Sequence, residues 1–172
     1  MASTIDVVLP RRVTNEYRGG AVPFWGFCLL FAAQIFSSTV HLLKADSGVN
    51  SIATIIVFPF EGPADPNNII YLFSAVGGVS QMMFTLLYAL VLWRYRSLIP
   101  LMLGFMLLEA LLGIVVTTLH PLTPEYFERT PPALTLRLPK LILIPTLLFM
   151  AIYRSKTEME QRSTPARAGD LA

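Results

Sequence analysis

The sequence alternates between long apolar stretches and shorter polar ones, and four of the apolar stretches are long enough to cross a lipid bilayer. A membrane-spanning helix needs about 20 apolar residues, because each residue adds about 1.5 Å along the helix axis. We therefore predict an all-α fold: a polytopic membrane protein built as an antiparallel four-helix transmembrane bundle. The expected spans are 22–43, 66–93, 98–119 and 131–153.

The polar connections predict how neighbouring spans are joined. The turn at Arg94–Arg96 is so short that the spans before and after it must be antiparallel neighbours. Outer loops are expected at 44–65 and 120–130. The first loop contains an apolar stretch, Ile52–Phe60, that is too short to cross the membrane and is expected to lie on its surface as a lid.

Basic residues are concentrated at the two ends of the chain and in one turn. Of the 13 Lys and Arg residues, three lie in the arm 1–21, two in the Arg94–Arg96 turn and four in the tail 154–172. Short segments rich in Lys and Arg stay in the cytoplasm. We therefore expect cytoplasmic termini, with a mobile N-terminal arm, a disordered C-terminal tail and a transmembrane domain, 22–153, in the plasma membrane.

Composition excludes several classes of protein. Hydrophobic residues make up 54% of the chain and charged residues 14%, which is too little polar surface for a soluble globule. The net charge of +2 reflects the basic side of a membrane protein and does not indicate a nucleic-acid partner. Cys28 is the only cysteine, so no intrachain disulfide can form. Signatures of soluble enzymes are missing, so no catalytic residue or metal site is assigned and a non-enzymatic role is favoured.

Four polar side chains fall at the same depth of the predicted bundle. Counting from the inner end of each span places Gln34, Gln81, Glu109 and Lys140 about 17–20 Å up, near the middle of the membrane. A lone charge there costs several kcal/mol, so these groups should face one another. We predict a Glu109–Lys140 ion pair flanked by the two glutamines.

Further polar residues extend this site toward the outer surface. His41, His120 and Arg137 are expected to cover it there, and Gln34 shares a helical stripe with His41. The second span carries a comparable row of small and polar residues: Ser74, Gly77, Gly78, Gln81, Thr85 and Tyr88. Four glycines are expected to be close-packing points between helices: Gly77, Gly78, Gly104 and Gly113.

Each of these residues also has a purely structural interpretation. Glu109 could bind a proton, a cation or an amine in a cavity, or it could belong to a pair that sets helix register. Lys140 could reach outward to the headgroups. The glutamines could serve only as hydrogen-bond partners between helices. A haem held by His41 and His120 is disfavoured, because histidines at headgroup level are ordinary interfacial residues, and no cofactor is predicted.

The leading functional hypothesis is a small membrane protein with an outward-facing polar cavity that binds or passes a small molecule, an ion or a lipid group. The alternative is a structural accessory subunit of a larger membrane complex, in which the polar residues only join helices. The third class is a membrane redox enzyme or cytochrome. Expected partners are the lipid bilayer itself and other membrane proteins or further copies of the chain.

Overall fold

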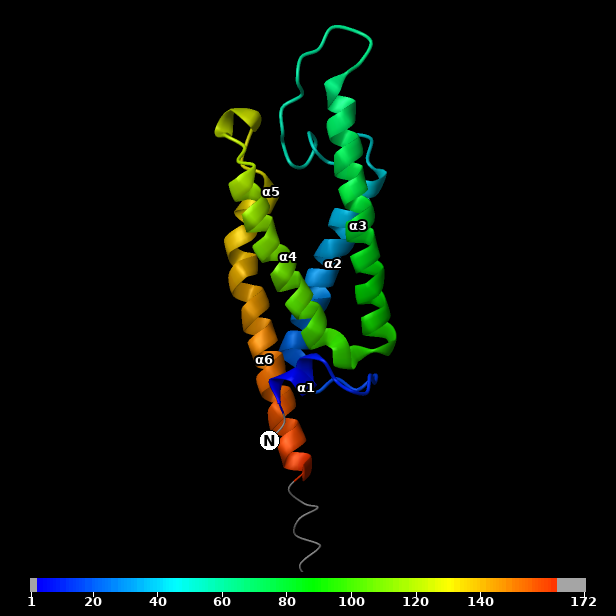
Figure 1. Cartoon of the computed structure of the whole chain (residues 1–172), viewed down its shortest axis with the longest axis vertical. Helices are drawn as coiled ribbons and strands as arrows, with labels where there is room; N and C mark the ends of the chain where they lie inside the picture. Colours follow the sequence, from blue (N-terminus) through cyan, green and yellow to red (C-terminus); the bar gives the residue numbers. More distant parts are fainter. Residues whose placement is uncertain (1–2, 164–172) are drawn as a thin grey trace, which may run out of the picture. The chain divides into compact units, whose positions relative to one another are not determined.

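The structure is a computed structural model that describes residues 3–163, and the statements below concern those residues (Figure 1). It contains six α-helices and two short 3-10 helices, with the bounds α1 Thr4–Val8, α2 Ala21–Leu43, α3 Pro66–Arg94, η1 Arg96–Leu98, α4 Ile99–Leu119, η2 Pro124–Tyr126, α5 Pro132–Thr135 and α6 Arg137–Ser163.

Four of these segments are long and apolar enough to cross a membrane: Ala21–Leu43, Pro66–Arg94, Arg96–Leu119 and Arg137–Arg162. Large apolar side chains on all four helices are exposed, so the protein itself does not bury them. A hydrocarbon environment would remove this surface from water without any protein partner. The prediction of an all-helical chain with four apolar helices of membrane-spanning length is therefore confirmed.

The last span differs from the expected helix at both ends. The predicted span 131–153 is broken at Leu136 into the single turn of α5 and the long helix α6. Pro145 lies inside α6, whose helix continues through it. At the other end α6 runs to Ser163, so the expectation of a disordered tail is wrong for residues 154–163. Those residues are mostly Lys, Glu, Met, Gln and Arg, which favour helix. The remainder of the predicted tail, 164–172, lies outside the described residues.

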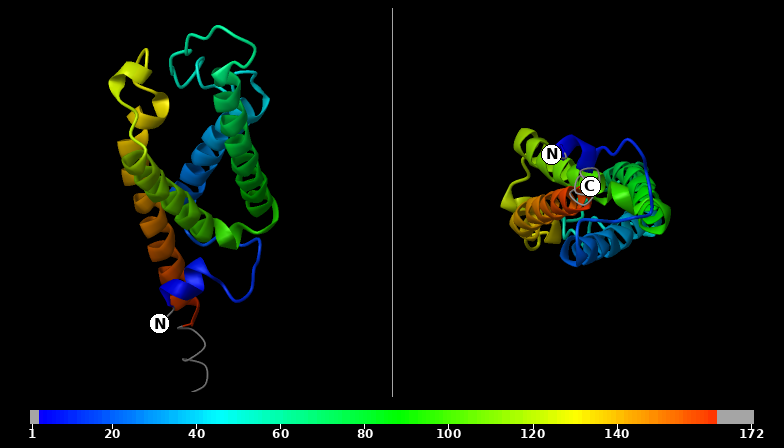
Figure 2. Two further views of the ribbon diagram at one scale, coloured as in Figure 1. Left: turned by 45° about the horizontal axis from the view of Figure 1, so that its top comes forward. Right: turned by 90° about the horizontal axis from the view of Figure 1, so that it is seen from below.

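The N-terminal arm is anchored rather than free between Thr4 and Gly20. Helix α1 is capped at its N-terminus by a capping box between Ser3 and Asp6. Further along, the Thr14 amide donates to the Ser97 hydroxyl at 3.0 Å, and the Ser97 amide donates to the Thr14 carbonyl at 3.2 Å. The arm thus lies against the η1 turn, and α1 lies beside the C-terminal half of α6 (Figure 2).

The chain divides into two compact units. Unit 1 comprises Met1–Leu30, Tyr88–Glu109 and Leu141–Ala172, and unit 2 comprises Phe31–Leu87 and Ala110–Lys140. Each of the four long helices contributes one segment to each unit.

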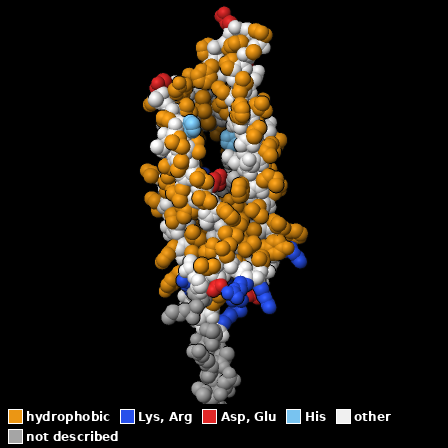
Figure 3. Space-filling model, viewed as in Figure 1, with side chains coloured by type: hydrophobic (Ala, Val, Ile, Leu, Met, Phe, Trp, Pro, Cys, Tyr) orange, Lys and Arg blue, Asp and Glu red, His pale blue; other side chains and the backbone are white. Residues whose placement is uncertain are grey.

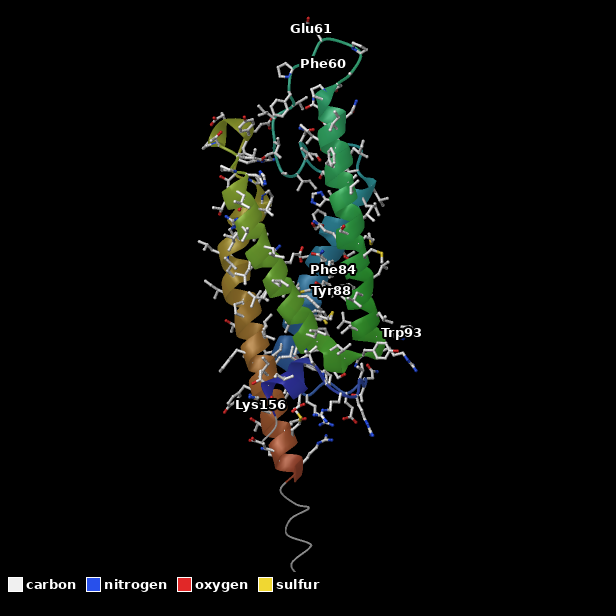
Figure 4. The ribbon with its side chains drawn as sticks, viewed as in Figure 1. Phe60, Glu61, Phe84, Tyr88, Trp93 and Lys156 are labelled. Carbon is white, nitrogen blue, oxygen red and sulfur yellow. The ribbon has the colours of Figure 1, made fainter. Side chains whose placement is uncertain are left out.

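Unit 1 has an apolar core formed by the first part of α2 and the last part of α3. Phe27 is 0% exposed and Tyr88 is 1% exposed, and their rings meet edge to face with centroids 5.7 Å apart. Gly26 allows α6 to approach, because a Cβ there would lie 2.6 Å from the methyl groups of Leu147. Trp93, at the end of α3, points away from this core (Figure 4).

In unit 2 the two outer loops pair with each other. The Glu128 amide donates to the Thr54 carbonyl at 2.9 Å, and the Ile56 amide donates to the Tyr126 carbonyl at 3.1 Å. The Thr54 hydroxyl also donates to the carbonyl of Arg129 at 2.6 Å. The apolar stretch that we expected to lie on the membrane surface is therefore tied to the 120–130 loop by backbone hydrogen bonds.

Candidate functional site

A row of hydrogen-bonding side chains joins α2 to α3 within unit 2. The Ser37 hydroxyl donates to Oε1 of Gln81 at 3.1 Å, and the Thr85 hydroxyl donates to the Ser38 hydroxyl at 3.1 Å. Ser38 and Thr85 are both buried. We call this row, together with His41 and Ser74 nearer the 44–65 loop, the α2–α3 seam. Sequence reasoning placed polar stripes on both helices, and the structure brings them together.

His41 is held in a defined orientation at the end of α2. Its Nδ1 lies 2.8 Å from the Ser47 carbonyl oxygen and 3.3 Å from the Ser74 hydroxyl. Because a carbonyl oxygen only accepts hydrogen bonds, Nδ1 carries a proton and donates it to the Ser47 carbonyl. The Ser47 hydroxyl in turn donates to the His41 carbonyl at 2.6 Å. The loop after α2 therefore fixes the orientation of the ring, and Nε2 makes no hydrogen bond with residues 3–163.

Gly78 is the point of closest approach in the seam. A Cβ at this position would lie 2.8 Å from the carbonyl carbon of His41. At Gly77, Gly104 and Gly113 a Cβ would meet nothing within 4 Å among the described residues, so the expectation that these three are close-packing points is wrong. Successive helical residues differ by about 100° in direction, so Gly77 cannot face the same neighbour as Gly78. Sequence reasoning missed Gly26, the packing point of unit 1.

The two predicted glutamines are placed differently. Gln81 belongs to the seam through Ser37. The amide nitrogen of Gln34 is buried and has no hydrogen-bond partner among residues 3–163. A buried amide without a partner is uncommon, and such a group is usually satisfied by a water molecule or a ligand. Gln34 therefore supplies an unused donor on the same stripe of α2 as Ser38 and His41.

Glu109 and Lys140, the predicted ion pair, belong to different units. Glu109 is the last α4 residue that belongs to unit 1. Lys140 is the last residue of the unit 2 segment Ala110–Lys140 and lies in the first turn of α6. Both side chains are exposed. The Glu109 carboxylate also interacts electrostatically with Tyr88 of the unit 1 core. Their pairing with each other stays a prediction.

Arg137 and His120, the other predicted outer residues, lie at the ends of α6 and α4. Arg137 donates from Nη2 to the Gly113 carbonyl at 3.3 Å and to the Thr117 hydroxyl, so it joins these two helices. His120 is exposed where α4 ends. Both histidines of the chain belong to unit 2. Figure 3 shows histidine side chains, in pale blue, beside a hollow in the face of the protein that the view displays.

These features define a class, an all-helical protein with four helices capable of crossing a membrane and a polar seam between two of them. Within residues 3–163, no group of three or more His, Cys, Asp and Glu side chains could hold a metal ion. Comparison of the chain with protein-family models, curated proteins and solved structures finds no match.

Proposed function

We propose that this protein is a four-span membrane protein whose outward-open polar cavity binds or passes a small cationic or hydrogen-bonding ligand at Glu109. The observation that carries the proposal is the exposed carboxylate of Glu109 inside a helix of membrane-spanning length. Glu109 is the only acidic residue between Asp65 and Glu125. A carboxylate facing hydrocarbon costs several kcal/mol, so its exposed face requires water, a ligand or a charged partner.

The proposed topology has both termini in the cytoplasm and antiparallel spans. The distribution of Lys and Arg supports the orientation. The register of the α2–α3 seam supports the antiparallel arrangement of the first two spans, because Ser38 pairs with Thr85 whereas His41 pairs with Ser74. Residue numbers thus rise along one helix as they fall along the other.

The remaining polar groups would complete the ligand site in this proposal. Counting residues along each predicted span puts Gln34, Gln81 and Lys140 at the same expected depth as Glu109. The amide nitrogen of Gln34, which has no partner among residues 3–163, and Nε2 of His41 are groups that a polar ligand or water could satisfy. Lys140 would neutralise Glu109 when no cationic ligand is bound, so that ligand binding and release of this ammonium group are coupled.

The cavity can be tested by cysteine labelling of the intact protein in right-side-out vesicles. In a Cys28→Ala background, Glu109→Cys should react with a membrane-impermeant maleimide added outside. Leu111→Cys is the matched control, because Leu111 is also exposed but lies about 200° around the helix from Glu109 and should face lipid. An unreactive thiol at position 109, or equal reaction at both positions, would overturn the outward-open cavity.

An accessory subunit of a larger complex is the second candidate, and the α2–α3 seam favours it. Direct hydrogen bonds close that seam, which is what polar residues acting only between helices would do. In that case Glu109 and Lys140 would form a dry pair. Glu109→Gln would then lower the free energy of unfolding or prevent assembly, the double variant Glu109→Lys with Lys140→Glu would restore it, and the thiol at position 109 would stay unlabelled.

A further inference from the structure

A basic pocket lies in unit 1, where the N-terminal arm meets the start of α2 and the C-terminal part of α6. Its volume is about 580 Å³, and its lining includes Arg18, Arg96 and Arg154 together with Trp25 and Glu158. Figure 3 shows Lys and Arg side chains gathered at this end of the protein. A smaller pocket of about 240 Å³ adjoins the arm and shares Arg18 in its lining.

The three guanidinium groups retain hydrogen-bond donors that residues 3–163 do not use. Arg96 donates from Nε to the Leu92 carbonyl at 2.8 Å and stacks over the ring of Phe24 at 5.7 Å, which holds its outer nitrogens in place. Arg18 uses Nη2 to pair with Glu16 at 2.9 Å. Arg154 makes no hydrogen bond or ion pair within residues 3–163, and its stem lies against Gly20.

The charge around the pocket remains positive after its acidic neighbours are counted. Arg162 acts electrostatically on Glu16, so it belongs to the same cluster. Among the described residues, the pocket and its neighbours then hold four arginines and two carboxylates. The arginines are Arg18, Arg96, Arg154 and Arg162, and the carboxylates are those of Glu16 and Glu158. A guanidinium fork matches the geometry of phosphate oxygens, and paired forks favour phosphate over a simple anion such as chloride.

The surroundings of the pocket match a headgroup better than a dissolved ion. Trp25, in its wall, is 67% exposed near the start of a helix of membrane-spanning length. Tryptophan prefers the boundary between hydrocarbon and headgroups. Lipid phosphates lie at the same level, and the proposed topology puts this end of the protein in the cytoplasmic leaflet, which is rich in anionic lipids.

We propose that this pocket binds the phosphate group of an anionic phospholipid, with Arg18, Arg96 and Arg154 as the donors. The bound lipid would join the N-terminal arm, the η1 turn and α6, because one of the three arginines comes from each of these segments. The site uses none of the residues of the cavity proposed above, so the cavity and the lipid site can fail separately, although both rest on the proposed membrane topology.

Native mass spectrometry of the purified full chain in mild detergent tests this site. Phosphatidylglycerol should bind more tightly than phosphatidylcholine, and Arg154→Gln should weaken its binding about tenfold, as expected for loss of one charged hydrogen-bond donor. Arg94→Gln is the matched control, because Arg94 is an exposed arginine of unit 1 that does not line the pocket. It should leave binding unchanged.

Three results would overturn the proposal. Equal weakening by Arg94→Gln and Arg154→Gln would show a diffuse surface charge instead of a site. Unchanged phosphatidylglycerol binding in the Arg18→Gln Arg154→Gln double variant would exclude the pocket. Thermal protection by millimolar inorganic phosphate that matches the protection by phosphatidylglycerol would assign the pocket to a free anion. Unfolding in phosphatidylcholine alone checks that the variants fold. All three substituted arginines are partly or fully exposed, so no loss of the fold is expected.

Discussion

Gly78→Ala and Gly77→Ala form a matched pair that tests the α2–α3 seam. The added methyl group at position 78 would lie 2.8 Å from the carbonyl carbon and Cβ of His41 and 2.9 Å from the amide nitrogen of Leu42. Ordinary contact begins at 3.4 Å, so the helices must separate by about 0.6 Å, the difference between 3.4 and 2.8. The backbone of α2 cannot rotate away as a side chain could.

The separation has a cost that can be estimated from the seam. Overpacking costs about 1–3 kcal/mol. The Ser37–Gln81 and Ser38–Thr85 hydrogen bonds, each 3.1 Å long, would stretch toward 3.7 Å, beyond hydrogen-bond range. Hydrogen bonds between membrane helices contribute about 0.6 kcal/mol each, so the total loss should be about 2–4 kcal/mol.

Gly77→Ala should have the opposite sign. No described atom lies within 4 Å of its added methyl group, and alanine is favoured over glycine within a helix by up to about 1 kcal/mol. The free energy of unfolding can be measured for both variants by titration with a denaturing detergent in mixed micelles, followed by near-ultraviolet circular dichroism. Equal stability of the two variants would show that α2 and α3 do not meet at Gly78.

Two further predictions concern groups outside the spans. Burial alone would raise the pKa of Asp46, but hydrogen bonds from Ser51 and Gly48 and the charge of Lys44 lower it to about 2, below its ordinary value of 3.8. The ionised carboxylate therefore stabilises the fold above pH 3.8, and this contribution should fade as the pH falls through about 2. Asp46→Asn should remove that pH dependence from acid-unfolding curves. An acid-unfolding curve that is the same for the variant and the original protein would contradict the lowered pKa of Asp46. The hydroxyl of Tyr17 is buried without a hydrogen-bond partner in the described part of the chain, and this burial raises its pKa, so the group stays neutral. In neutral detergent without anionic lipid, Tyr17→Phe should leave the free energy of unfolding unchanged or raise it by about 1 kcal/mol, whereas a fall of that size would show that the hydroxyl has a partner.

Local pattern by itself determined the number, type and approximate bounds of the long helices. Runs of apolar residues are a property of consecutive positions, so length alone marks a helix that can cross a membrane. The start of α3 was also predicted from local sequence, by Asp65 as the N-cap and Pro66 in the first turn. In the structure α3 begins at Pro66, and the Asn67 amide donates to the Asp65 side chain at 2.8 Å. The break at Leu136 and the extension of α6 to Ser163 were not anticipated, because helix ends depend on weaker local preferences.

Only the tertiary structure decided which residues of each helix meet. The sequence showed polar stripes on two spans, but the rotation and register that pair Ser38 with Thr85 and select Gly78 over Gly77 depend on packing between distant segments. The pairing of the outer loops through Thr54 and the basic pocket around Arg154 likewise join residues far apart in the chain. Periodicity within one helix carries no information about the rotation of its partner. For that physical reason the contacts between helices, between the outer loops and around the basic pocket could not be predicted from the sequence.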